Sequence, residues 1–392
     1  MIGLVVVAVI AVAGAAYAAT RNSGSGSGGS GSASATPTTA ESINLLVQPP
    51  DGSTNVSLDT IISVTAVTGR LTGVTVAGAD GAAVAGSLTS GGTAWRSSAS
   101  LALKTDYTVT IDAAMPSGKA TEQVTHFKSL VPTATLGVTI TPATGLTVGV
   151  AQPIVLRFDH TVTNKDALMA QLHVTASPPV SGGWHWFSSK ELHFRPQQYW
   201  PTGQKVTVTA DLKGFNAGGG VWGASTSTSS FAVGDSHIST ANVQTHVMTV
   251  TSNGAVVATY PLSAGRTKYP TMGGVHIDLY RQQDVHMVSS SVGIAVNSAD
   301  GYDEHVYWDV NISDGGEYVH AAPWSTGAQG NSNVSHGCIN LSPTNAQAFY
   351  NFSRIGDVIE VTGSPRGPDL GDHGTMDWNL AWSSWTPATI GA

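Results

Sequence analysis

The sequence predicts a multidomain protein that is mostly β. Only 11% of its residues are charged, whereas about a quarter is usual for a soluble globular protein. Short runs of alternating apolar and polar residues recur along the chain, and Gly, Pro, Asp and Asn separate them, which is typical of short strands joined by turns. At 392 residues the chain is too long for one compact domain. We therefore expect several β-sandwich domains and few helices.

The N-terminus is predicted to export the chain. Residues 1–19 form an unbroken apolar run, and as a helix they would span about 28 Å, close to the thickness of a bilayer core. A signal peptide cleaved after Ala16-Tyr17-Ala18 is the alternative. We expect residues 1–20 to be a membrane anchor or signal segment, residues 21–42 to be a flexible Gly/Ser linker, and the rest of the chain to be extracytoplasmic.

Two β-sandwich domains are predicted next, over residues 43–130 and 131–233. The first contains alternating stretches such as Tyr107-Thr108-Val109-Thr110-Ile111, with turns such as Pro50-Asp51-Gly52 between them. The second contains a dense aromatic cluster that includes Trp184-His185-Trp186 and Tyr199-Trp200. We expect this cluster to be sandwich core plus an interdomain contact; a glycan-binding surface is the alternative.

The third folded segment, residues 234–363, is also expected to be mostly β. Asn253-Gly254 between two alternating runs predicts a hairpin. One short helix is predicted, with Ser342 as its N-cap, Pro343 at its first position and Gly356 beyond its end. Residues 364–392 carry Trp378, Trp382 and Trp385, and we expect this extension to pack on the third domain.

The charge and the cysteine content exclude several classes of protein. A formal net charge of −8 gives no basic surface, so nucleic acid is not an expected partner. One cysteine in the whole chain, Cys338, rules out an intramolecular disulfide. A free thiol in an exported protein is either buried and inert or retained for its chemistry.

The residues around Cys338 favour chemistry. An imidazole within hydrogen-bond reach can remove the thiol proton and produce a nucleophile. His336 lies two residues before the cysteine and His320 lies 18 residues before it, and the spacing alone leaves both open as the base. Gly337 removes a Cβ beside the thiol, and the N–H groups of Gly337 and Cys338 are candidates to hold an oxyanion. A zinc site made by His320, His336 and Cys338 is the alternative, but this ligand set is thin and we expect no metal.

The same stretch resembles the signature of a known family. His320, a spacer, and then Ser335-His336-Gly337-Cys338-Ile339-Asn340 are similar to the motif of the L,D-transpeptidases (YkuD-type catalytic domain), in their actinobacterial and mycobacterial form. The flanking residues agree, and the resemblance covers nearly the whole chain, least clearly over the first β domain. It implies two immunoglobulin-like β-sandwich domains, then an L,D-transpeptidase β-sandwich catalytic domain with one short helix, then the Trp-rich C-terminal extension.

The resemblance also implies an activity. Such enzymes form 3→3 cross-links between peptidoglycan stem peptides through a cysteine thioester, taking a tetrapeptide donor and a diamino-acid acceptor, in cell wall biogenesis. Carbapenems acylate the same thiol, and no metal or organic cofactor is implied. The alternatives are an L,D-carboxypeptidase that hydrolyses the same donor and a non-catalytic wall-binding protein.

The family pattern, carried over to this sequence, implies a role for each site residue. Cys338 would be the nucleophile and His320 the general base, oriented by the backbone carbonyl of Ala321, where relatives often have Ser. His336, Gly337 and Asn340 would shape the site around the thiol. The implied substrate-binding residues are Met287 and Tyr302 on a flap, with Gly316, Trp324, Ser335 and Asn340.

Overall fold

The computed structural model describes residues 42–388, 390 and 391. The predicted anchor or signal segment, and all of the predicted linker except its last residue, lie outside the described residues. Within the described part, no helix is both long and apolar enough to cross a membrane. The prediction of a mostly β protein is confirmed, since strands dominate every folded segment and fill three separate hydrophobic cores.

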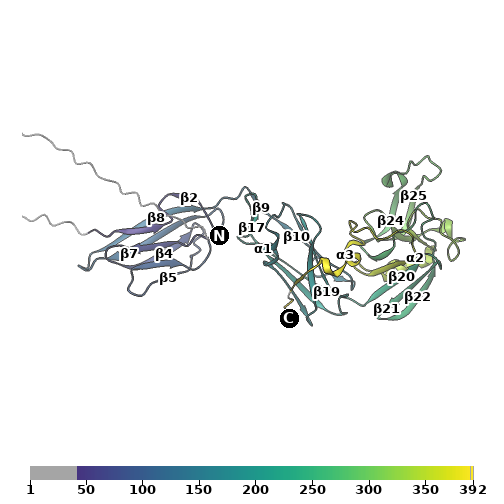
Figure 1. Cartoon of the computed structure of the whole chain (residues 1–392), viewed down its shortest axis with the longest axis horizontal. Coiled ribbons are helices and arrows are strands. Elements are labelled where there is room, and N and C mark those ends of the chain that lie inside the picture. Colours follow the sequence, from purple (N-terminus) through teal and green to yellow (C-terminus); the bar gives the residue numbers. More distant parts are fainter. Residues whose placement is uncertain (1–41, 389, 392) are drawn as a thin grey trace, which may run out of the picture. The chain divides into compact units, whose positions relative to one another are not determined.

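The first folded segment is a sandwich of two four-stranded sheets (Figure 1). Alternation along its strands turns one face inward, so Tyr107, Val109 and Ile111 are buried in the core and the residues between them face outward. One sheet has the order β1 (Leu45–Gln48), β3 (Ser63–Ala66), β6 (Ala94–Ser97) and β5 (Gly86–Leu88). The other has the order β2 (Ser53–Val56), β8 (Ala120–Ser129), β7 (Asp106–Ala114) and β4 (Arg70–Gly78).

The second folded segment is also a sandwich, and its core contains Trp184 and Trp200 of the expected aromatic cluster, together with Phe194. One sheet runs β10 (Val138–Thr141), β12 (Ile154–Phe158), β15 (Glu191–Pro196), β14 (Gly182–Trp186) and β29 (Thr386–Ala388). The other runs β11 (Thr147–Val148), β19 (Thr226–Val233), β16 (Lys205–Asp211) and β13 (Leu172–Ser177). A small sheet of β17 (Asn216–Gly218), β18 (Val221–Gly223) and β9 (Ala134–Leu136), and a short helix α1 (Lys165–Met169) that the sequence did not predict, complete it.

The third folded segment packs a five-stranded sheet against a four-stranded sheet around its own core. The larger sheet runs β22 (Ala255–Pro261), β21 (Val247–Ser252), β20 (His237–Asn242), β28 (Val358–Thr362) and β23 (Gly274–Ile277). The smaller sheet runs β24 (Tyr280–Val288), β25 (Asp303–Asn311), β26 (Tyr318–Ala321) and β27 (Ile339–Leu341). The domain boundaries drawn from the sequence stay a prediction.

Two local predictions in this segment are confirmed. Asn253 and Gly254, with φ of 50° and 82°, join β21 to β22 in the left-handed conformation that two-residue hairpin turns require. The predicted helix is α2 (Pro343–Phe352), and the Ser342 side chain accepts a hydrogen bond from the Asn345 N–H at its N-terminus. Helix α2 packs on β25 and β26, so it supports the sheet that carries the cysteine motif.

The C-terminal extension contacts two folded segments, whereas the sequence analysis placed it on the third alone. Its short helix α3 (Met376–Asn379) lies against the third segment, where the Asn379 side chain bonds both backbone groups of Val275 at 3.0 and 2.8 Å. The chain then runs to the second segment, where β29 pairs antiparallel with β14. The reason is that β14 would otherwise be a sheet edge with unpaired backbone groups.

Candidate active site

Parallel pairing of β26 with β27 brings the two parts of the cysteine motif together. Val319 is opposite Ile339 and His320 is opposite Asn340, and Cys338 directly precedes β27. The 17 residues between His320 and Cys338 form the crossover that a parallel pair requires. They contain a short 3₁₀ helix, Pro323–Ser325.

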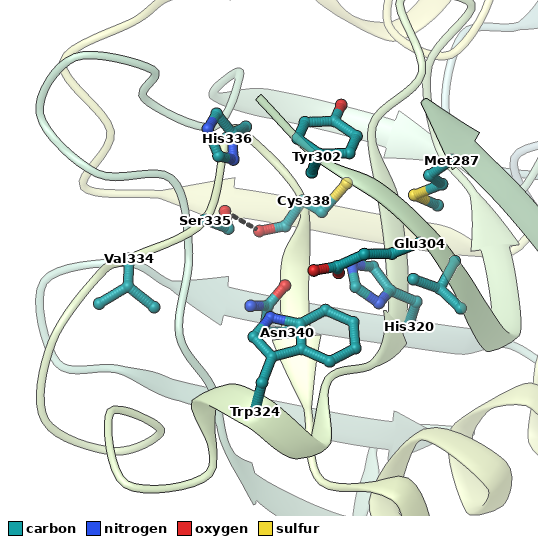
Figure 2. A pocket seen from close by; sticks show the side chains of 11 residues that line it. Met287, Tyr302, Glu304, His320, Trp324, Val334, Ser335, His336, Cys338 and Asn340 are labelled. Carbon is teal, nitrogen blue, oxygen red and sulfur yellow. Dashed lines mark hydrogen bonds between the residues drawn. The ribbon is translucent and has the colours of Figure 1, made fainter. Parts of the chain in front are cut away.

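The motif opens on a cavity that most of the predicted site residues line (Figure 2). Predicted residues on its wall are Met287, Tyr302, His320, Trp324, Ser335, His336, Cys338 and Asn340. Three others lie directly behind it: Ala321 beside His320, Gly337 beside Cys338, and Gly316, whose carbonyl oxygen is 3.8 Å from the Cys338 Sγ. The structure therefore brings together every site residue that the sequence singled out.

His320 is buried, and its orientation is fixed by one backbone contact. Its Nδ1 donates to the carbonyl oxygen of Ala321 at 2.9 Å, which leaves Nε2 as the unprotonated nitrogen of a neutral ring. Burial lowers the pKa of His320 to about 4. The imidazole is therefore neutral at physiological pH and able to accept a proton. Because the contact uses a backbone oxygen, the Ala321 side chain is not needed for it.

His336 has a different environment. Its Nε2 lies 2.7 Å from Nη2 of Arg266, and a guanidinium can only donate, so Nε2 accepts that hydrogen bond. Burial and the neighbouring Arg266 charge lower the pKa of His336. Its ring also lies beside Tyr269 and Tyr302, with centroids 5.1 and 5.0 Å away. The lone pair that a base would use is therefore already occupied.

The thiol of Cys338 is held in its neutral form. Burial raises its pKa to about 12, and the nearby carboxylates of Glu317 and Asp309 act in the same direction. The resting pair is therefore a thiol and a neutral imidazole. Transfer of the thiol proton to the imidazole creates a thiolate and an imidazolium side by side. Because the two charges attract each other, part of the cost of desolvating them is offset.

Ser335 and Gly337 hold the turn that presents the thiol. The Ser335 hydroxyl donates to the Cys338 carbonyl oxygen at 2.6 Å and accepts from the Gly337 N–H at 3.1 Å. This bond occupies one of the two N–H groups expected to hold an oxyanion, and the Cys338 N–H is the remaining candidate. The Ser335 hydroxyl is likewise used inside the turn, while the residue also lines the cavity, so its expected role in substrate binding stays a prediction.

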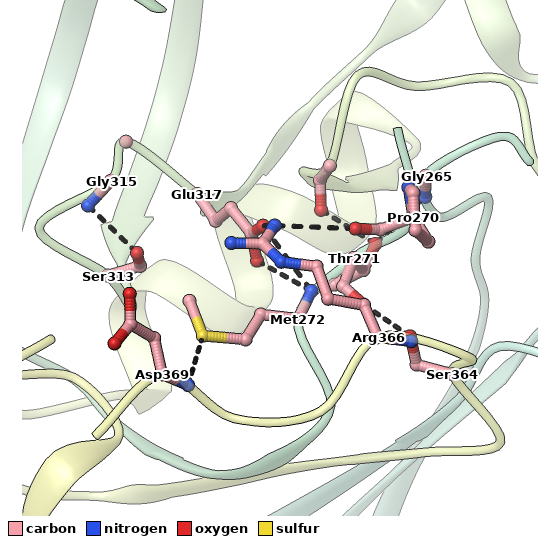
Figure 3. A network of polar contacts seen from close by, with 12 residues as sticks. Gly265, Pro270, Thr271, Met272, Ser313, Gly315, Glu317, Ser364, Arg366 and Asp369 are labelled. Atoms are coloured by element: carbon pink, nitrogen blue, oxygen red, sulfur yellow. Dashed lines mark hydrogen bonds and ion pairs between the residues drawn. The ribbon is translucent and has the colours of Figure 1, made fainter. Parts of the chain in front are cut away.

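A polar network behind the turn explains why position 337 is glycine (Figure 3). Gly337 has a φ of 134°, and a Cβ there would lie 3.2 Å from Glu317 Oε1. Glu317 is fixed by the Met272 N–H and by Arg366 Nη1, the latter at 2.5 Å, and burial raises its pKa to about 7. Thr271 donates to the Gly337 carbonyl oxygen at 2.6 Å. The turn is thus held from both sides.

Asn340 and Trp324 complete the wall of the cavity. The Asn340 side chain donates from Nδ2 to Ser325 Oγ at 3.0 Å, while its buried Oδ1 has no hydrogen-bond partner among the described residues. In Figure 2 that oxygen points toward the space between Cys338 and His320. Trp324 is 54% exposed, and its ring centroid lies 6.1 Å from that of His320. A bound substrate would therefore meet the exposed indole face of Trp324 beside the thiol, whereas Asn340 Oδ1 is buried in the wall.

Sequence reasoning missed several residues of the site. Glu304, Val306 and Val334 line the cavity, and Arg266 and Asp300 pair at 2.5 Å beside His336. Val334 lies in the spacer of the cysteine motif, directly before Ser335, and the others lie outside the motif. Only one signal was available for Glu304, namely that charged residues are rare in this chain.

Comparison with known proteins agrees with this geometry. Residues 236–361 match the family described as L,D-transpeptidase catalytic domain, YkuD, and residues 53–216 match the bacterial Ig domain. The chain is 38% identical over 335 residues to L,D-transpeptidase 2 of Mycobacterium tuberculosis, covering 86% of this chain and 82% of that protein. It is 34% identical over 349 residues to L,D-transpeptidase 5 of the same species, covering 87% and 76%.

A solved structure gives the same answer for the C-terminal part. The LD transpeptidase LdtMt1, solved in complex with imipenem, superposes with a TM-score of 0.51 at 36% identity, covering 59% of this chain and 100% of that one. The predicted order of immunoglobulin-like and catalytic folds is thereby confirmed. The chain belongs to the L,D-transpeptidase family, as the motif around Cys338 predicts.

Proposed function

We propose that this chain is a peptidoglycan L,D-transpeptidase, an acyltransferase whose nucleophile is Cys338 and whose general base is His320. The observation that carries the proposal is the arrangement of adjacent strands β26 and β27, which present a neutral imidazole and a thiol to one cavity. The family membership supports the reaction class. The choice of His320 over His336 rests on hydrogen bonding: His320 keeps Nε2 available, whereas Nε2 of His336 accepts from Arg266.

The first half-reaction forms a thioester. Cys338 Sγ attacks the carbonyl carbon between residue 3 and D-Ala 4 of a tetrapeptide stem, and the thiol proton passes to His320 Nε2. The Cys338 N–H is placed to stabilise the oxyanion. His320 then gives its proton to the D-Ala nitrogen, the C–N bond breaks, and D-Ala leaves. Residue 3 of the donor stem remains bound to sulfur as an acyl group.

The second half-reaction forms the cross-link. The side-chain amine of residue 3 in another stem attacks the thioester carbonyl and loses a proton to His320. The C–S bond breaks, the proton returns to sulfur, and a 3→3 amide bond is formed. Tyr302, Met287, Gly316 and Trp324 are proposed as the substrate-binding residues, together with Asn340 on the cavity wall.

The proposed substrate fits an extracytoplasmic site. The segment at residues 1–20, apolar up to Ala19, would anchor the chain or direct its export, and the linker at 21–42 would separate the folded domains from the membrane surface. We further propose carbapenems as inhibitors that acylate Cys338, since the similar LdtMt1 structure was solved in complex with imipenem.

A mass-spectrometric assay tests the function. The soluble ectodomain is incubated with a disaccharide-tetrapeptide stem, and the products are weighed. A cross-linked dimer plus D-Ala is expected. Tripeptide without dimer would instead identify an L,D-carboxypeptidase, and unchanged substrate would identify a non-catalytic wall-binding protein.

Two variants test the assignment of the residues. Cys338→Ala is expected to abolish D-Ala release and the covalent meropenem adduct together. His320→Gln is expected to lower the rate of adduct formation by about 100-fold or more, because general-base assistance contributes roughly 10²–10⁴. A persistent adduct in Cys338→Ala, or a larger loss in His336→Gln than in His320→Gln, would show that the roles are assigned wrongly.

A further inference from the structure

A second cluster of ionisable side chains lies away from the cavity, where three parts of the chain meet. Glu191 and His193 come from β15 of the second folded segment, and His373 comes from the C-terminal extension. One donor atom from each of these residues lies within 4.8 Å of the others. Glu191 Oε1 is 2.8 Å from His193 Nε2 and 2.6 Å from His373 Nε2. His193 is 1% exposed, so the cluster is built into the structure.

Both imidazoles are oriented by a carboxylate on the other side of the ring. His193 Nδ1 lies 2.8 Å from Asp377 Oδ1, and His373 Nδ1 bonds Asp314 Oδ2. A carboxylate that accepts from Nδ1–H fixes the ring and leaves the Nε2 lone pair pointing the opposite way. This is the arrangement that supports histidine ligands in metal sites. Here both Nε2 atoms converge on the carboxylate of Glu191.

The charges around the cluster favour a cation. Glu191, Asp314 and Asp377 contribute three negative charges. Arg157 pairs with Glu191 at 3.2 Å, and Arg195 lies close enough to Asp377 to attract it. Three carboxylates and two guanidinium groups leave one negative charge in excess when both imidazoles are neutral. Without an ion, both Nε2 atoms carry a proton and donate to Glu191, because the surrounding carboxylates raise the pKa of His193 and raise that of His373 to about 9. A metal ion at this site would take the place of those two protons.

We propose that Glu191, His193 and His373 bind a divalent transition-metal ion, with Zn²⁺ the best fit. Two imidazole nitrogens and one carboxylate oxygen form a common three-residue ligand set for zinc, and water takes the fourth position of a tetrahedron. With bonds of about 2.0–2.2 Å, tetrahedral ligand atoms lie roughly 3.3–3.5 Å apart. The Glu191 carboxylate, 2.8 and 2.6 Å from the two nitrogens, would therefore withdraw by about 0.5–0.9 Å to admit the ion.

The position of this site suggests what the ion does. Asp314 lies on the loop between β25 and β26, two residues before Gly316, whose carbonyl faces the Cys338 thiol. The His373 backbone N–H also donates to Asp314, at 3.2 Å. An ion held by Glu191, His193 and His373 would join the second folded segment, the extension and this loop of the catalytic segment. This metal is separate from the thiol site at which the sequence analysis expected none.

The test is zinc binding by the full-length chain at pH 7.5. The protein is equilibrated with ZnSO₄, passed through a desalting column and analysed for bound zinc. We expect one Zn²⁺ per chain and a rise in the melting temperature of about 3 °C or more at saturation, reversed by EDTA. His373→Ala, which removes a partly exposed ligand, and Glu191→Gln, which keeps the size of the side chain, are each expected to weaken binding by at least about 100-fold, with unchanged circular dichroism.

Two controls separate this site from others. Cys338→Ser should keep the full zinc stoichiometry, because the ion does not use the thiol. His160→Ala should keep it as well, since His160 pairs with a neighbouring Asp159 but stands outside the cluster. The proposal is overturned if the wild-type chain retains no zinc, if His373→Ala binds as tightly as the wild type, or if Cys338→Ser loses the ion. The proposal is also overturned if lowering the pH, in place of adding zinc, stabilises the wild-type chain and this stabilisation is lost in His373→Ala. That result would mean that the cluster holds two protonated imidazoles.

Discussion

At the scale of single residues, the resting state of the nucleophile makes a prediction about pH. Burial raises the pKa of Cys338 to about 12 and lowers that of His320 to about 4. When the pKa of a thiol lies far above the pH, the fraction present as thiolate increases tenfold with each pH unit. Alkylation of Cys338 by iodoacetamide should therefore accelerate about tenfold per unit between pH 6 and 9. Intact mass over time measures it.

Acylation by meropenem should behave differently, because in the proposed mechanism His320 removes the proton during attack. The imidazole is neutral above its pKa of about 4, so the acylation rate should be nearly constant between pH 5.5 and 8 and fall only below about pH 5. A plateau in the iodoacetamide rate over the same range would reveal a stable thiolate–imidazolium pair and contradict the neutral resting state.

Glu304 supports a second prediction at this scale, concerning the acceptor. Its exposed carboxylate lines the cavity that holds Cys338 and His320, and the acceptor amine is cationic before it is deprotonated. Attraction between them would favour acceptor binding at the thioester. Glu304→Gln is expected to raise the KM for the amine acceptor several-fold, since partly exposed charge pairs contribute up to about 1 kcal/mol.

The control for Glu304 is the half-reaction that uses no amine. Meropenem acylation of Glu304→Gln should proceed at the wild-type rate. The acceptor KM of the wild type and of Glu304→Gln is then measured at low and at high salt. The same KM in both proteins at both salt concentrations would exclude an electrostatic role for the Glu304 carboxylate.

At the scale of single elements, the turn before β27 depends on Gly337. Its φ of 134° is a conformation that L side chains rarely adopt, and a Cβ would also press on the fixed carboxylate of Glu317. Strain of about 1–3 kcal/mol would be relieved by rotating the turn that carries Cys338. We expect Gly337→Ala to fold but to lose about 100-fold or more in meropenem acylation rate, because a small displacement of a nucleophile is costly.

Gly254 offers a matched control for that substitution. It also has a positive φ, 82°, in the β21–β22 turn, and a Cβ there meets nothing within 4 Å. Gly254→Ala should lower the melting temperature slightly and leave acylation unchanged. Equal losses of activity in the two variants would mean that the effect of Gly337→Ala is a general loss of stability.

A single helix or turn was predictable from the sequence where the residues that determine it lie within the element itself. Ser342-Pro343 marks the start of α2 because an N-cap and an N1 proline act within one turn of helix, and Asn253-Gly254 marks its hairpin for the same reason. The choice between His320 and His336 was not local. It depends on Arg266, which lies 70 residues before His336 and meets it only in the folded sheet.

At the scale of the whole molecule, the sequence predicted the fold class and the order of segments but not how the extension is used. Composition could show that Trp378, Trp382 and Trp385 pack somewhere. It could not show that they surround Arg195 of β15, with ring centroids 4.6, 5.0 and 4.8 Å from the guanidinium carbon. The pairing of β29 with β14, about 200 residues earlier in the chain, depends on which sheet edge is left unpaired. Neither local sequence pattern nor periodicity predicts which edge that is.

The last prediction concerns this pairing. Removing residues 381–392 deletes β29, Trp382 and Trp385, the latter 3% exposed. Strand β14 becomes a bare edge, and the His185 imidazole loses its 2.7 Å bond to the Ser384 carbonyl oxygen. Burial of a large aromatic side chain contributes about 3–5 kcal/mol. The truncated ectodomain should therefore melt at least about 5 °C lower, while the catalytic segment, which keeps α3, should react with meropenem at the wild-type rate.

Hydrogen exchange locates the effect within the sheet. Amides of β14 should exchange faster in the truncated chain, whereas those of β10, at the opposite edge of the same sheet, should not change. Continued protection of β14 would mean that β29 does not hold that edge. A loss of meropenem reactivity with intact β14 protection would instead place the function of the extension at the active site. The expected pattern, a weakened second segment beside an unchanged catalytic one, would mean that the C-terminal strand stabilises the second segment and contributes nothing directly to the chemistry at Cys338.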